Sequence, residues 1–238
     1  MTDPAPAGIE PLPGDRFAQL TGPLAGTTRM RLEVVENSPL SPGMQQVVLT
    51  APGLAGFSYR PGQDIMLMVA VAGNGGAGTA RPVRRRYTIR SLDHARRLLT
   101  LHIVRHPDGP GERWVQRARP GDTVEGIGPR GKIFPAPGAD WHLFAGDDSA
   151  LPAFFAMAGS LPPGTPATVI MEVPGPQDEQ PLAAAADVTL SWLHRGNRPA
   201  GEAAALAAAA AAVPLPPGTG HVYLAGEASM VLALREVF

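Results

Sequence analysis

The spacing of hydrophobic and polar positions changes a little past the middle of the chain. Before that point, apolar and β-branched residues gather in short runs separated by turn signals rich in Gly, Pro and Asp. Short strands at this spacing are typical of a small antiparallel barrel. The runs predict six strands, over residues 29–36, 44–50, 65–71, 85–91, 98–105 and 123–127.

From Trp141 onward, compact apolar runs alternate with longer segments that favour helices. Alternating strands and helices predict a parallel sheet with helices on its faces. Pro152 stands where it fits the first turn of a helix. Strands are predicted over 141–145, 168–173, 188–193 and 222–225, and helices over 151–161, 202–213 and 227–238.

These patterns predict a β-barrel plus α/β architecture in two domains. Residues 28–136 form the antiparallel six-stranded barrel, and residues 137–238 form the parallel-sheet domain. Residues 1–27 are rich in Pro, Gly and Ala and are interpreted as a flexible arm. A short helix is expected over 114–117, after the turn at Gly109–Gly111.

Composition and charge narrow the possible chemistry. There is no cysteine, which excludes thiol catalysis, Cys-ligated clusters and disulfides. Residues 81–130 carry twelve arginines against five acidic residues, so this part attracts anions. No nucleic-acid-binding motif is present. The N-terminus is not a signal peptide and the longest apolar run, 65–72, cannot span a bilayer, so we expect a cytoplasmic protein without a membrane span.

The segment Arg81–Arg90 holds the candidate cofactor chemistry. In it, Arg85-x-Tyr87-Thr88 combines a guanidinium fork for phosphate, a ring that can stack and a hydroxyl that can meet a ring nitrogen. Arg85 and Tyr87 share one face of a strand because side chains alternate. Further along, Gly109 and Gly111 let backbone N–H groups approach a phosphate ahead of a helix N-terminus.

Six motifs in order carry a resemblance to a known family. The chain resembles, over residues 29–238, the siderophore-interacting proteins, flavoproteins of the ferredoxin–NADP reductase superfamily that reduce ferric siderophores. The motifs are Arg85–Arg90, His106–Trp114, Pro120–Asp122, Gly128–Gly131, Ala145–Ala153 and Ala225–Ala228.

The resemblance implies that the barrel binds FAD. It implies that Tyr87 stacks on the isoalloxazine, that Thr88 hydrogen-bonds near N5, and that Arg85 contacts a phosphate. Glu112 departs from the small residue that is common there, and Arg113 is a candidate to offset its charge; a role for His102 is left open. The full set implied for FAD is Arg85, Tyr87, Thr88, Val104, His106, Gly109, Gly111, Glu112, Arg113, Asp148 and Ser149.

The resemblance also implies NADPH or NADH as electron donor, with ferredoxin as an alternative. The residues implied at the nicotinamide nucleotide are His194, Arg195, Gly226 and Glu227. No Gly-x-Gly-x-x-Gly fingerprint is present. Members of the family usually continue beyond the point that corresponds to Phe238, so we expect the NAD(P)H-binding-like domain to be shortened at its C-terminus.

The implied function is reduction of Fe3+ in a ferric siderophore, with release of Fe2+. No catalytic side chain and no protein-bound metal are expected, because the flavin carries the redox chemistry. Arg81, Arg84 and Arg86 are candidates for steering the anionic substrate. Another flavin or electron-transfer reductase on this scaffold, and a non-catalytic siderophore or flavin binder, are the alternatives.

Overall fold

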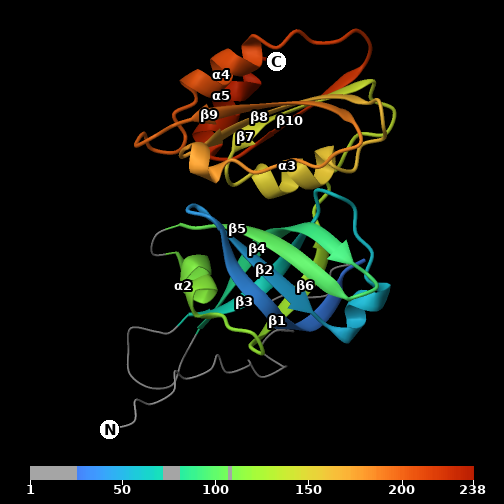
Figure 1. Ribbon diagram of the computed structural model, residues 1–238, viewed down its shortest axis with the longest axis vertical. Coiled ribbons are helices and arrows are strands. Elements are labelled where there is room, and N and C mark those ends of the chain that lie inside the picture. The colour runs from blue at the N-terminus through green and yellow to red at the C-terminus, as the bar shows by residue number, and fades with distance from the viewer. Residues whose placement is uncertain (1–25, 72–80, 107–108) are drawn as a thin grey trace.

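The computed structural model describes residues 26–71, 81–106 and 109–238. The predicted arm over 1–27 and the Gly-rich segment 72–80 therefore lie almost wholly outside the described residues. The ribbon has two layers, with a barrel below and an α/β unit above (Figure 1). The boundary that the sequence places between residues 136 and 137 stays a prediction.

The first layer is a closed antiparallel barrel, as the sequence predicts. Its strand order is β1-β2-β5-β4-β3-β6, and β6 pairs back with β1. The strands are β1 (Thr28–Ser41), β2 (Met44–Thr50), β3 (Asp64–Val71), β4 (Arg81–Asp93), β5 (Leu98–Val104) and β6 (Thr123–Arg130).

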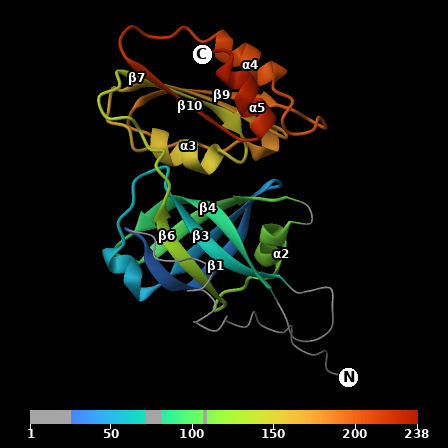
Figure 2. The ribbon, with the colours of Figure 1, turned by 180° about the vertical axis from the view of Figure 1, so that it is seen from behind.

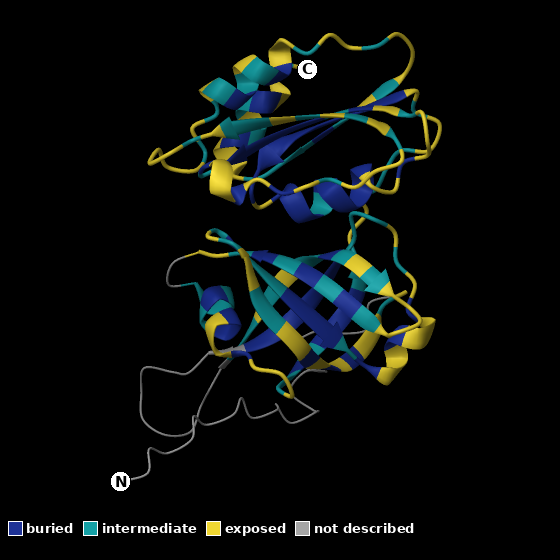
Figure 3. Ribbon diagram, viewed as in Figure 1, coloured by how far each residue is buried: buried dark blue, intermediate teal, exposed yellow. Residues whose placement is uncertain are grey.

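Alternation of buried and exposed positions builds the barrel core. In β1, Met30, Leu32 and Val34 are buried while the residues between them are exposed. In β5, Leu99 and Leu101 are buried in the same way. This period of two is what places one face of each strand inside the barrel (Figure 3).

A short helix, α2 (Pro110–Arg117), packs against the barrel, and the 3-10 helix η1 (Pro52–Gly56) lies elsewhere on it. The sequence predicted only residues 114–117 as helical. The helix begins earlier because Pro110 suits a first helical position and Gly109 takes an extended conformation before it. Trp114 is buried in the barrel core. Asn37 ends the helix by donating to the carbonyls of Val115 and Ala118, at 2.6 and 2.9 Å.

The second layer is a four-stranded parallel sheet of order β10-β7-β8-β9. From β7 the chain builds β8 and β9 on one side of β7, and then returns to place β10 on the other side. The switch point of the sheet therefore lies between β7 and β10. The elements are β7 (Trp141–Asp147), α3 (Leu151–Ala158), β8 (Pro166–Val173), η2 (Pro176–Asp178), β9 (Asp187–His194), α4 (Ala204–Ala211), β10 (Gly220–Ala225) and α5 (Ala228–Arg235).

Helix α3 lies between the sheet and the barrel, whereas α4 and α5 cover the opposite face of the sheet (Figures 1 and 2). Most residues of α3 are buried, which is expected of a helix enclosed on both sides (Figure 3). Pro152 occupies its first turn, as predicted. Helix α3 contacts β4 and β5, so it holds the α/β sheet against the strand that carries Tyr87.

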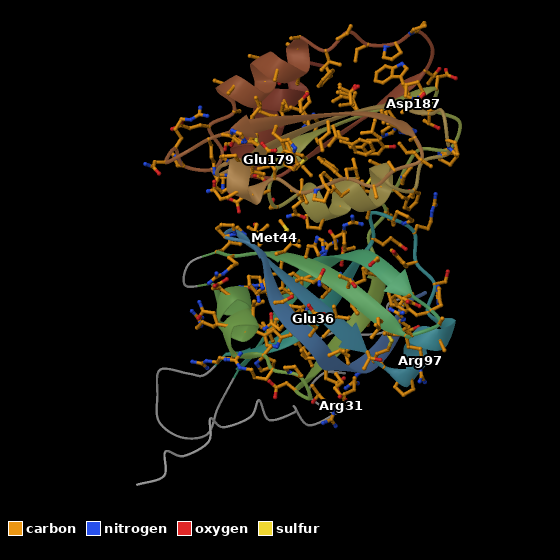
Figure 4. The ribbon with its side chains drawn as sticks, viewed as in Figure 1. Arg31, Glu36, Met44, Arg97, Glu179 and Asp187 are labelled. Carbon is orange, nitrogen blue, oxygen red and sulfur yellow. The ribbon has the colours of Figure 1, made fainter. Side chains whose placement is uncertain are left out.

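A second contact joins the two layers at the β1–β2 hairpin. Met44, labelled in Figure 4, packs in the apolar cluster of α3 and the sheet. The Asp178 carboxylate accepts hydrogen bonds from Ser41 Oγ at 2.7 Å and from the backbone N–H of Gly43 at 2.8 Å. The hairpin therefore fixes the barrel to the segment that follows β8.

Two sequence expectations need adjustment. The strand predicted over 123–127 is longer, because β6 continues through Arg130 into the Gly128–Gly131 motif before Gly131 adopts a φ of +92°. All three predicted α/β helices are present but shorter than expected. No helix in the described ranges has the length and apolarity needed to cross a membrane.

Candidate functional site

A cavity of about 410 Å³ lies where β4, β5, α2 and the start of α3 meet. Strands supply one wall, and the first turn of α2 supplies another. It brings together most of the residues that the sequence assigns to FAD. The cavity is lined by Arg85, Arg86, Tyr87, Thr88, His102, Ile103, Val104, His106, Gly109, Pro110, Gly111, Glu112, Ser149 and Pro152.

Strand β4 presents Arg85 and Tyr87 to α2. A Cβ built on Gly111 would lie 2.5 Å from Tyr87 Oη and 3.9 Å from Arg85 Cγ, so both side chains reach the same turn of the helix. Arg86 instead bonds the Asp64 carboxylate on β3. Arg85 and Tyr87 therefore share a face that Arg86 does not, which is the arrangement expected from strand alternation.

The Tyr87 hydroxyl is buried and has no hydrogen-bond partner in the described part of the chain. Its ring stacks near Trp114, with centroids 6.3 Å apart and planes at 25°. Burial raises the pKa of Tyr87 to about 12, although Arg85 acts to lower it. A protonated, unpartnered hydroxyl at a cavity wall is a donor that a ligand oxygen can satisfy.

The N-terminus of α2 also faces this cavity. Gly109 precedes the helix without a capping side chain, and Pro110 and Gly111 follow it. Uncapped N–H groups and the helix dipole favour an anion at this end. The N-terminal turn therefore lines the cavity with groups that favour an anion, and the phosphate site placed here by the sequence stays a prediction. Residues 107 and 108 of that loop lie outside the described part.

One oxygen of the Glu112 carboxylate is held by neighbouring side chains, and the other, Oε2, is buried without a hydrogen-bond partner among the described residues. Its Oε1 accepts from Arg105 at 3.0 Å and from Gln116 Nε2 at 2.9 Å. Arg105 therefore compensates charge on Glu112, and the contribution expected of Arg113 stays a prediction. Sequence reasoning did not assign Arg105 to the site; its position at the end of β5, opposite the first turn of α2, becomes evident only in the fold.

His102 is a second residue of the cavity that the sequence left unassigned. Its Nδ1 is buried and unpartnered. Burial, helped by the charge of Arg90, lowers the pKa of His102 to about 4, so the imidazole is neutral at pH 7. Together with the Tyr87 hydroxyl and the α2 N–H groups, it makes a wall of donors and acceptors that fits a phosphorylated, flat cofactor such as FAD.

A second cavity of about 330 Å³ adjoins the first at the carboxyl ends of the sheet strands. Val104, His106 and Ser149 line both. In open α/β sheets, ligands bind at this edge, near the switch point. The remaining lining residues of the second cavity are Gly43, Arg105, Asp147, Asp148, Pro174, Arg195, Ala200, Gly226 and Glu227.

Asp147 fixes the floor of the second cavity. Its Oδ1 accepts from the backbone N–H and hydroxyl of Ser149 at 2.9 and 2.6 Å, and its Oδ2 accepts from the Glu227 N–H at 2.8 Å. Gly226 has a φ of +136°, and a Cβ there would lie 2.6 Å from Asp147 Oδ2. Asp147 thus ties the end of β7 to the end of β10, a role that the sequence did not separate from that of Asp148.

Asp148 and Arg195 form an ion pair of 2.7 Å, and each side chain is only 12% exposed. Burial raises the pKa of Asp148, although the hydrogen bond and charge of Arg195 act to lower it. One guanidinium nitrogen, Arg195 Nη1, is buried without a partner. Arg195 therefore lines the second cavity while paired with Asp148, and its contact with the nicotinamide nucleotide stays a prediction.

The other four predicted residues, one for the nicotinamide nucleotide and three for substrate steering, differ in their relation to the two cavities. His194 bonds Glu179 at 2.8 Å and lines neither cavity. Arg84 is exposed and lines neither, while Arg86 lines the first cavity but is paired with Asp64. Arg81 begins β4, and its side chain is outside the described part.

The closed barrel followed by a parallel sheet defines the fold of the ferredoxin reductases. A ferredoxin reductase from carbazole 1,9a-dioxygenase superposes with a TM-score of 0.67 over 90% of this chain and 66% of its own. The two are 20% identical, so this likeness shows the fold alone.

The chain belongs to the siderophore-interacting protein family. The model of the siderophore-interacting FAD-binding domain matches residues 33–133, and that of the siderophore-interacting protein matches residues 139–238. The barrel is therefore an FAD-binding domain.

Individual relatives agree with this assignment. An uncharacterized protein of Mycobacterium tuberculosis is 34% identical over 234 residues, covering 88% of this chain and 83% of its own. The structure of a siderophore utilization protein from T. fusca is 30% identical, with a TM-score of 0.78 over 89% of this chain and 86% of its own. The siderophore-interacting protein SipS of Aeromonas hydrophila is 29% identical, with a TM-score of 0.74 over 88% and 84%.

Proposed function

We propose that this protein is an FAD-dependent reductase of ferric siderophores that draws its electrons from NAD(P)H. The observation that carries the proposal is the continuity of the two cavities through Val104, His106 and Ser149. A flavin held in the first cavity and a nicotinamide held in the second would meet at these residues.

The names of several relatives support the iron substrate. A ferric vibriobactin reductase of Vibrio cholerae is 32% identical over 158 residues, which cover 66% of this chain and 58% of its own. An NADPH-dependent ferric-chelate reductase of Escherichia coli is 28% identical over 135 residues. These activities belong to those proteins, and for this chain they are the substrate and donor classes to test first.

In the first cavity, the proposal gives each side chain a separate task. Tyr87 donates its unpartnered hydroxyl and packs against the cofactor, Thr88 hydrogen-bonds its ring, and Arg85 takes a phosphate oxygen. The N–H groups at Gly109 and Gly111 bind the diphosphate. The ion pair with Arg105 reduces the repulsion between the Glu112 carboxylate and these phosphates.

Bound FAD supplies the change from two-electron to one-electron chemistry, accepting a hydride and passing electrons singly to Fe3+. Two ferric centres are reduced for each NAD(P)H oxidised. Hard oxygen ligands hold Fe3+ more tightly than Fe2+, so reduction loosens the iron from the siderophore. The proposal assigns the redox chemistry to the flavin and calls for no protein nucleophile.

In the second cavity, Asp147 positions the backbone of Ser149 and Glu227 for the nucleotide. Gly226 lets that backbone approach closely, because it has no Cβ and takes a positive φ. Arg195 offers its unpartnered Nη1 to an anionic group of the nucleotide. Exposed Arg84 contributes positive charge toward an anionic ferric siderophore.

The experiment that tests the proposal is a spectrum followed by anaerobic titrations. The purified protein should be yellow, and NADH or NADPH should bleach the flavin absorption. Ferric siderophores added next should restore the colour and release Fe2+ to a colorimetric chelator, with two Fe2+ per NAD(P)H. A protein that cannot be loaded with FAD would refute the proposal.

Two further arms separate the alternatives. Reduced ferredoxin replaces NAD(P)H as donor in one arm, and free flavin or oxidised ferredoxin replaces the siderophore as acceptor in the other. Faster reduction of these acceptors than of any ferric siderophore would indicate a different reductase. A flavin that none of the three donors bleaches would indicate a non-catalytic binder.

A further inference from the structure

Arg90 lies two residues beyond the Tyr87-Thr88 pair, and the cofactor assignments above do not use it. The register of β4 and β5 breaks at this residue: Ile89 pairs with Leu101 and Ser91 pairs with Thr100, so Arg90 is the extra residue of a β-bulge. Bulges redirect side chains and are common beside active sites.

The environment of Arg90 is unusual for a cation. Its Nε is buried and has no hydrogen-bond partner among the residues that the structure describes. Within the described ranges no carboxylate forms an ion pair with it. The titratable groups that sense its charge are Tyr59 and His102, and both are neutral at pH 7 because burial raises the pKa of the first and lowers that of the second.

An arginine keeps its proton even when burial lowers its pKa, so Arg90 remains a partly buried charge without a counter-ion. Such a charge is costly unless an anion compensates it. The anion therefore has to come from outside the described protein groups. Glu112, the buried carboxylate of the cofactor cavity, is already held by Arg105.

His102 links Arg90 to the cofactor cavity. It lines the cavity and presents a buried, unpartnered Nδ1, and its neighbours in β5, Leu101 and Ile103, point into the barrel core. His102 therefore points outward, toward the cavity. A neutral imidazole can donate from one nitrogen and accept at the other.

In the proposed site, Arg85 and the N-terminus of α2 bind the phosphates of the cofactor. This leaves the flavin ring system as the partner for Arg90 and His102. A hydride brings two electrons and one proton, so the ring system gains one negative charge on reduction. Charge placed near a flavin ring tunes its redox properties. We infer that His102 touches the flavin ring and that Arg90, acting through His102, stabilises the negative charge that FAD gains on reduction.

This inference rests on the cofactor site proposed above and makes Arg90 a positioning and electrostatic residue. Its test compares Arg90→Gln, which removes the charge, with Arg90→Lys, which keeps it. The readouts are the Kd of oxidised FAD for the apoprotein and the midpoint potential of bound FAD. Arg97→Gln, in the exposed β4–β5 turn labelled in Figure 4, is the matched control.

Arg90→Gln should weaken the binding of reduced FAD about tenfold relative to oxidised FAD, which corresponds to a potential about 30 mV lower. Arg90→Lys should retain most of the wild-type potential, and Arg97→Gln should retain all of it. His102→Gln should also lower the potential. These four results together would support the inference.

A second readout needs no cofactor. In the apoprotein of Arg90→Gln, NMR titration should show a higher pKa for His102 than in the wild type, because one of the two causes of its lowering is gone. An Arg90→Gln potential equal to that of Arg97→Gln, or an unchanged His102 pKa, would overturn the inference. If Arg90→Gln does not fold, a wild-type potential in His102→Gln overturns the inference equally. Failure of the wild type to bind FAD would instead refute the cofactor site itself.

Discussion

Replacing Gly111 with alanine is the sharpest test of the cofactor cavity. The added methyl group would lie 2.5 Å from Tyr87 Oη and 3.7 Å from its Cζ. Ordinary contacts between such atoms begin near about 3.5 Å, so the hydroxyl has to move by about 1 Å. Tyr87 is buried against Trp114, and the ring cannot move further into the barrel without overpacking it.

The expected loss of FAD affinity depends on whether the Tyr87 ring is free to move away from the added methyl group. In the FAD-free protein, the hydroxyl makes no hydrogen bond, so the ring can swing toward the empty cavity. Alanine also favours the helix by up to about 1 kcal/mol over glycine, which offsets the strain. With FAD in place the ring is fixed, and the overpacking costs about 1–3 kcal/mol. The Kd for FAD should therefore rise about 5- to 150-fold.

The assay is calorimetric titration of the apoprotein with FAD, together with thermal unfolding of the FAD-free protein. Gly56→Ala is the control, because nothing lies within 4 Å of a Cβ built at Gly56. We expect the FAD-free Gly111→Ala protein to unfold within a few degrees of the wild type. Wild-type affinity for FAD in Gly111→Ala would refute the geometry argued for Tyr87 and α2.

Three further predictions concern single contacts. Asp148→Asn leaves Arg195 without its counter-ion in a site where both side chains are only 12% exposed. Urea unfolding should show a loss of about 3 kcal/mol in the free energy of unfolding. The double variant Asp148→Asn, Arg195→Met should recover part of that loss. Asp147→Asn weakens the bonds that join the end of β7 to Glu227, and should cost about 1.5–3 kcal/mol and raise hydrogen exchange at the Glu227 N–H; exchange unchanged from the wild type would contradict the role given to Asp147. The pKa of His102 is lowered to about 4 in the fold, so the unfolded chain binds more protons between about pH 6.5 and 4. The contribution of His102 to stability is therefore full above about pH 6.5 and falls by at most about 3 kcal/mol as the pH drops through this window. Urea unfolding should show a smaller fall in His102→Gln than in the wild type.

Strand alternation and turn residues were enough to predict the fold class. The barrel strands follow a period of two that the sequence displays directly, as in Met30, Leu32 and Val34. Element ends were less accurate because they depend on tertiary contacts. Helix α2 begins at Pro110 and ends where Asn37, far away in β1, binds its last carbonyls, and no local pattern announces that contact.

The same distinction separates the parts of the site that the sequence could and could not indicate. Tyr87, Gly109 and Gly111 come together through short segments whose motifs are local. The pairing of Arg105 with Glu112 requires the end of β5 to lie beside α2, and the approach of Arg195 to Asp148 requires the parallel order of the sheet. These pairings could not be read from sequence because charged residues offer many possible partners.

Those long-range pairs also divide the arginines of the chain into two kinds. Arg86, Arg105 and Arg195 each form an ion pair with a carboxylate of the protein, which compensates their charge. Arg85 lies at the cofactor cavity and bonds only a backbone carbonyl, and Arg90 forms no ion pair among the described residues. Of these five arginines, the two without a carboxylate partner among the described residues lie on β4, on either side of Tyr87. A ligand that is negatively charged at one end and gains charge at the other on reduction matches that distribution better than a simple phosphate does.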